Sequence, residues 1–163
     1  MAYNPKWPKW VQASVADHFK TAATAGGFAS LVDGLEERTS AFQENPQRLE
    51  IRINGPFITQ MSSNYYQFLV DVNILIFSHM DGSIDSVYRG TNIAGTMAQS
   101  ASDSIPVHKY GAEVGDDASL IGCLSLNDGP RAGVNVFHLG EVNAEDRLRQ
   151  LAVECSFKMD INP

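Results

Sequence analysis

The most constraining feature of this sequence is a strict alternation of apolar and other residues near its C-terminus. Over residues 151–161 every second residue is apolar, namely Leu151, Val153, Cys155, Phe157, Met159 and Ile161. A period of two is the side-chain repeat of a β-strand, whose successive side chains point to opposite faces. The alternation predicts a strand inside the main sheet, with Val153, Cys155, Phe157 and Met159 facing a helix.

Other segments repeat the strand signal. In residues 48–54 the apolar Leu49, Ile51 and Ile53 alternate with polar residues, and Gly55-Pro56 is expected to end that strand. Residues 65–78 read as a longer strand that is apolar on one face and, towards its end, on both. Shorter strands are expected at residues 28–32, 105–110, 120–126 and 134–139, with a polar loop through residues 36–45.

Two segments show helical spacing instead. Residues 8–23 carry apolar side chains three and four positions apart, with Pro8 suited to the first turn and Gly26-Gly27 to the end. Residues 84–101 carry a second such stripe, and Ser83 is a natural N-cap. The chain of 163 residues, 44% of them hydrophobic, is long enough to bury one core. We therefore expect a single α+β domain over residues 1–163, a mostly antiparallel or mixed β-sheet packed against two α-helices, with residues 1–10 as an aromatic N-terminal arm.

The charge balance argues against a nucleic-acid-binding protein. The chain has 12 basic and 19 acidic residues and a net charge of −7, whereas phosphate binding depends on Lys and Arg. No apolar run reaches the roughly 18 residues of a membrane span, and the N-terminus lacks the apolar core of a signal peptide. Cys123 and Cys155 make no disulfide framework, so we expect both to stay reduced.

Residues with catalytic or metal-binding chemistry form no recognisable constellation. His79 and Asp81 lie close in the sequence but lack a third ligand, and Asp116-Asp117 is typical of a charged loop tip. A metal-dependent hydrolase would need these four residues to converge in one pocket. The interpretation favoured by the sequence is a protein that is no enzyme, with no catalytic, cofactor-binding or metal-binding residues.

Three aromatic residues in the arm, Tyr3, Trp7 and Trp10, are candidates for an oligomer interface. Trp7 and Trp10 are three positions apart at a helix start and so lie on neighbouring positions of one face. Their rings could cover the edge of their own core or anchor a neighbouring subunit, since aromatic residues often dominate interface energy. The sequence leaves both alternatives open.

The order of these elements resembles that of tail terminator proteins of long-tailed bacteriophages. The resemblance is carried by an N-terminal helix, the strand Arg48-Leu-Glu-Ile-Arg-Ile-Asn-Gly-Pro56, the long strand 65–78, a helix from Ile84, short strands that include residues 120–124, and the closing strand 151–159. It is a likeness of element order over most of the chain.

The resemblance implies a structural protein of the virion tail or neck that assembles in the host cytoplasm. Members of this group form rings, commonly of six subunits, that close the head-proximal end of the tail tube. The implied partners are further copies of the chain, the tail tube protein and a neck or head-completion protein, with DNA only passing through the ring and no membrane contact. Neighbouring roles are another head–tail connector, a neck protein or a tail-tube protein, and a virion-surface binding module is a further alternative.

Overall fold

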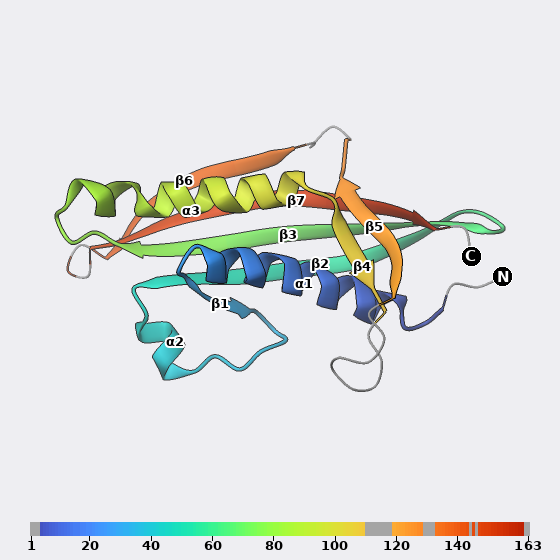
Figure 1. Cartoon of the computed structure of the whole chain (residues 1–163), viewed down its shortest axis with the longest axis horizontal. Coiled ribbons are helices and arrows are strands. Elements are labelled where there is room, and N and C mark those ends of the chain that lie inside the picture. The colour runs from blue at the N-terminus through green and yellow to red at the C-terminus, as the bar shows by residue number, and fades with distance from the viewer. Residues whose placement is uncertain (1–3, 110–118, 129–132, 144, 146, 162–163) are drawn as a thin grey trace.

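The computed structural model describes residues 4–109, 119–128, 133–143, 145 and 147–161. The chain forms α-helices and a mixed β-sheet, which confirms the predicted α+β class (Figure 1). In chain order the elements are α1 (Trp7–Ala25), β1 (Ala29–Val32), α2 (Ser40–Glu44), β2 (Gln47–Ser62), β3 (Tyr65–His79), α3 (Ile84–Ser102), β4 (Ile105–His108), β5 (Leu120–Leu126), β6 (Val134–Asn143) and β7 (Leu148–Ile161).

The described strands form one sheet around three long antiparallel strands, β2, β3 and β7. The strand order is β1-β2-β3-β7-β5-β4, and β6 also pairs with β7. All pairs are antiparallel except β1 with β2, which run parallel. Helices α1 and α3 lie side by side across one face of this sheet, so the opposite face of the long strands is left without a helical layer (Figure 1).

The closing strand behaves as its alternation predicts. β7 lies inside the sheet, between β3 on one side and β6 and β5 on the other. Its odd-numbered residues from Leu151 to Ile161 are buried beneath the helices, and the ring of Phe157 lies 6.1 Å from that of Phe19 in α1. The predicted face toward a helix is therefore confirmed.

Strand β2 differs from its prediction because it does not end at Gly55-Pro56. The strand continues to Ser62, with a shift of register between Asn54 and Phe57. Proline lacks the N–H that a ladder needs and is tolerated where a strand has no neighbour on that side. β1 pairs only with residues 48–51, so Pro56 lies beyond the reach of β1 and the strand can pass through it.

The two predicted helices differ from their predictions only at their margins, and a third, short helix was not predicted. α1 begins at Trp7, with proline in its first turn, so residues 7–10 belong to this helix and not to an extended arm. The predicted polar loop contains α2, where the hydroxyl of Thr39 accepts a hydrogen bond from the N–H of Phe42. Ser83 caps α3 by accepting from the N–H of Ser86, as predicted. Within the described residues, no helix combines the length and apolar character that crossing a membrane requires.

Candidate functional site

The aromatic residues proposed for an interface lie in different places. Trp10 is 4% exposed and belongs to the core of its own chain. Trp7 is half-buried, with its ring 6.1 Å from that of Trp10 and 5.9 Å from that of Phe68 in β3. Tyr3 lies outside the described residues. Trp10 therefore packs against the core of its own chain, which is the first of the two alternatives. Trp7 keeps only part of its surface exposed.

Of the four residues considered for a metal site, the structure describes His79 and Asp81. His79 ends β3, whereas Asp81 belongs to the turn that starts α3. Asp116 and Asp117 lie outside the described residues. In the part of the chain that the structure describes, no group of three or more His, Cys, Asp or Glu side chains could hold a metal ion.

Asp81 has a local structural role. Its Oδ1 accepts hydrogen bonds from Ser83 Oγ at 2.6 Å and Ser83 N at 2.9 Å, and Arg89 lies 3.9 Å away. These hydrogen bonds favour the charged carboxylate and, with a smaller effect of Arg89, lower the pKa of Asp81 to about 2. The carboxylate therefore helps to hold the turn that precedes α3.

We expect Ser83→Ala to raise the pKa of Asp81 from about 2 towards its ordinary value of 3.8, because the hydroxyl donor is lost. Since the folded pKa is lowered, this carboxylate stabilises the fold above its ordinary pKa, and the effect disappears as the pH falls towards 2. An NMR titration of the Asp81 carboxyl carbon measures the shift. An identical pKa in the variant would contradict the role given to Ser83.

The two cysteines are both free and differ in exposure. Cys123 is exposed, whereas Cys155 is buried on the helix-facing side of β7. Burial, together with a smaller effect of the charge on Asp71, raises the pKa of Cys155 to about 12. Because the thiolate is the reactive form, Cys155 is not suited to nucleophilic chemistry near neutral pH.

Alkylation of the native protein at neutral pH should therefore modify Cys123 and leave Cys155 unmodified. The same reagent should modify both cysteines after unfolding in denaturant, since burial is what protects Cys155. Peptide mass spectrometry without reductant distinguishes these products. Labelling of Cys155 in the native protein at the rate of Cys123 would contradict its burial.

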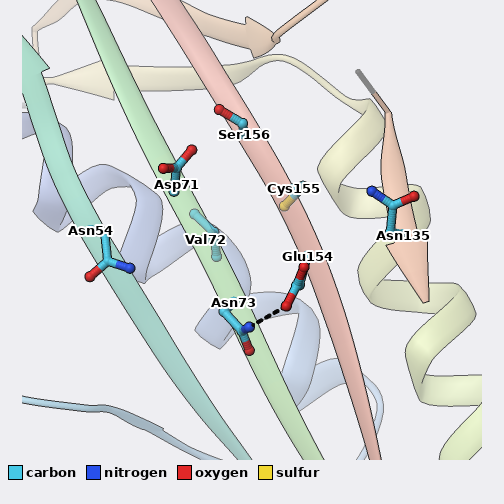
Figure 2. Close-up of a pocket in the computed structure, with 8 residues that line it drawn as sticks. All are labelled: Asn54, Asp71, Val72, Asn73, Asn135, Glu154, Cys155 and Ser156. Atoms are coloured by element: carbon cyan, nitrogen blue, oxygen red, sulfur yellow. Dashed lines mark hydrogen bonds between the residues drawn. The ribbon is translucent and has the colours of Figure 1, made fainter. Parts of the chain in front are cut away.

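The helix-free face of the sheet contains a shallow polar pocket of about 270 Å³ (Figure 2). In it Asn73 Nδ2 donates a hydrogen bond to Glu154 Oε1 at 2.9 Å across β3 and β7. The lining residues are Asn54, Asp71, Val72, Asn73, Asn135, Glu154, Cys155 and Ser156. The carboxylates of Asp71 and Glu154 line the pocket together with Ser156, and Asp71 of β3 is paired with Ser156 of β7.

A surface with clearer functional character is the hairpin formed by the end of β2 and the start of β3. From Ile53 to Val70 the sequence contains no Asp, Glu, Lys or Arg. Three large apolar residues are nevertheless well exposed there: Phe57 by 53%, Met61 by 56% and Tyr65 by 37%. We call residues 53–70 the uncharged hairpin. Figure 1 shows that the tip of this hairpin projects beyond the end of β7, where Ile161 pairs with Tyr66.

A second apolar surface lies on β6. Four of its side chains are between 41% and 52% exposed, namely Val136, Phe137, Leu139 and Val142. A third is the start of α3, where Ile84 is 79% and Tyr88 57% exposed. The uncharged segment was visible in the sequence, but its exposure was not, because strand residues of this type are more often covered.

Comparisons with known proteins identify the fold and no more. No protein-family model matches the chain, and no curated protein matches it. Eighteen chains of solved structures match. One of them covers 95% of this chain and 96% of its own length, with a TM-score of 0.54 and 9% sequence identity. The likeness extends over the whole domain, and at this identity it concerns the fold alone.

Proposed function

We propose that this protein is a structural subunit of a phage tail, a tail terminator. It forms a ring that closes the head-proximal end of the tail tube and joins it to the neck. The element order that resembles tail terminators supports the proposal, as does the whole-domain α+β fold. The observation that carries it is the exposed uncharged hairpin.

The composition of the uncharged hairpin is that of an interface core. Interface cores are depleted in charged residues and enriched in aromatic residues and Met, and Phe57, Met61 and Tyr65 match that description. An exposed apolar patch on a soluble domain usually marks a surface that another molecule covers. The hairpin therefore supports a function in assembly, with no reaction of its own.

The proposed partners are further copies of the chain, the tail tube protein and a neck or head-completion protein. DNA would pass through the ring without being held. A net charge of −7 suits that passage, because an acidic surface repels phosphates. The protein would assemble in the host cytoplasm and remain in the virion tail or neck.

The test combines oligomer size with binding to tail tubes. Native mass spectrometry should find a closed oligomer, either free or after mixing with tubes of the tail protein from the same virus. Negative-stain electron microscopy should find the protein at one end of each tube. Monomers that do not bind tube ends would contradict the proposal. Rings that bind only the isolated neck would show that the protein is another connector.

A matched pair of variants tests the role of the hairpin. Phe57→Ser with Met61→Ser should abolish assembly and keep the circular dichroism spectrum unchanged, since both side chains are exposed in the single chain. Leu35→Ser is the control, because Leu35 is 60% exposed but lies outside the hairpin, after β1. Equal effects of the two changes on oligomer size would remove the hairpin's special role.

A further inference from the structure

We propose that neighbouring copies of this chain join by strand pairing. The outer edge of β2 in one copy, at residues 57–62 beyond Pro56, forms an antiparallel ladder with the outer edge of β6 in the next copy. This inference rests on the proposed ring and specifies the contact that builds it.

Both edges lack a pairing strand among the described residues. β1 covers β2 only at residues 48–51. Beyond them, Gln12 Nε2 of α1 donates a hydrogen bond to the carbonyl of Gly55. β6 pairs with β7 on one side and with no described strand on the other. Unpaired edge groups are a template for another strand.

The usual protection against such pairing covers only part of each edge: Pro56 interrupts β2, and register shifts interrupt β6 after His138 and after Glu141. Natural edges are shielded by lysines, prolines or short length. β6 is 10 residues long with Glu141 as its charged residue, and residues 53–62 have no charge. Their exposed side chains include Phe57 and Met61 on one edge and Phe137 and Leu139 on the other. Cross-strand pairs of this apolar type stabilise a ladder.

The strand directions fit a rotational assembly. The strands β2, β3, β7 and β6 are neighbours in that order, and each pair is antiparallel. Because four strands alternate in direction, β2 and β6 run in opposite directions. A copy related by simple rotation therefore brings β6 beside β2 in the antiparallel sense. Such head-to-tail contacts use both edges and close into a ring when the rotation between copies divides a full turn evenly.

The two edges lie at different positions along the strand direction of the sheet. Val134 at the start of β6 pairs with Cys155, Cys155 with Val72, and Val72 with Ile53. β6 therefore flanks the half of the sheet that carries β1, whereas the free part of β2 lies in the other half. Pairing the edges offsets each copy from the next along the strands. A closed sheet requires an offset of this kind.

Cross-linking between engineered cysteines tests the contact. The background is Cys123→Ser, which keeps the buried Cys155. Thr59→Cys places a thiol on β2 and Asn135→Cys places one on β6, both at exposed positions. A short flexible bis-maleimide tolerates small differences in register. A mixture of the two single variants should give a cross-linked dimer, and the chain with both changes should give a ladder that ends at the ring size.

The outcomes separate this inference from the proposed function. Rings seen by light scattering that give no β2–β6 cross-link overturn the edge pairing and leave the ring intact. Cross-linked dimers of Thr59→Cys alone indicate a two-fold β2–β2 contact and also overturn it. Monomers without cross-links overturn both proposals. A β2–β6 ladder that does not bind tube ends supports the pairing and counts against the tail terminator.

A charge placed on the edge gives an independent readout. Thr59→Lys with Met61→Lys should weaken the rings, so that on dilution they dissociate at a protein concentration about tenfold or more higher than the wild type. Loss of one anchoring contact has an effect of this size. Gln99→Lys, at an exposed position of α3, is the control and should leave it unchanged. Circular dichroism establishes that all three proteins fold. Equal dissociation of the edge variant and the control would overturn the proposal.

Discussion

Replacing Phe157 by alanine is expected to lower the free energy of unfolding by about 3–5 kcal/mol. The side chain is 0% exposed, and its ring lies 6.1 Å from that of Phe19 in α1. On the sheet, Phe157 pairs with Val70 of β3 and Leu126 of β5. Removing the ring would leave a cavity where a helix and three strands meet, and such a site has little freedom to collapse.

Chemical denaturation followed by circular dichroism measures this loss. Phe137→Ala is the matched control, because Phe137 lies on the neighbouring strand β6 and is 45% exposed. Its substitution should change the stability of the single chain by no more than about 0.5 kcal/mol. A loss below about 1 kcal/mol for Phe157→Ala would show that the helix-facing side of β7 is not the core.

The sequence predicts the central strands well because their burial is one-sided and regular. In β3 the alternation places Phe68 and Ile74 on the buried face, and both are fully buried. The path of β2 beyond Asn54 could not be predicted in this way. Whether Gly55-Pro56 ends a strand or passes along a sheet edge depends on whether a neighbour pairs there, and β1 is too short to do so.

The candidate site was harder to predict than the fold for a related reason. Trp10 and Phe57 are both large aromatic residues in segments with few charges. Trp10 is buried because α1 packs on the sheet, whereas Phe57 lies in the part of β2 beyond β1 and is 53% exposed. Sequence patterning indicates which face of an element is apolar. It does not indicate where the covering layer ends, and that boundary defines the exposed surface.

Gly90→Ala is expected to destabilise the fold by about 1–3 kcal/mol, which is the usual cost of overpacking a core. Gly90 lies in α3 where this helix approaches β3 and β7. A Cβ there would lie 2.8 Å from Leu151 Cδ1 and 3.2 Å from Ser78 Cβ. Leu151 is fully buried and Ser78 Cβ is fixed to the backbone of β3, so neither atom can move away at low cost.

The same substitution five residues later provides the control. A Cβ at Gly95 would meet no atom within 4 Å, and Gly95 is exposed on the same helix. Gly95→Ala should therefore stabilise the protein by about 0.5–1 kcal/mol, since alanine favours the helix over glycine. Thermal and chemical denaturation of both variants should give changes of opposite sign. If Gly90→Ala also stabilised the protein, α3 would have to lie farther from the sheet than the structure places it.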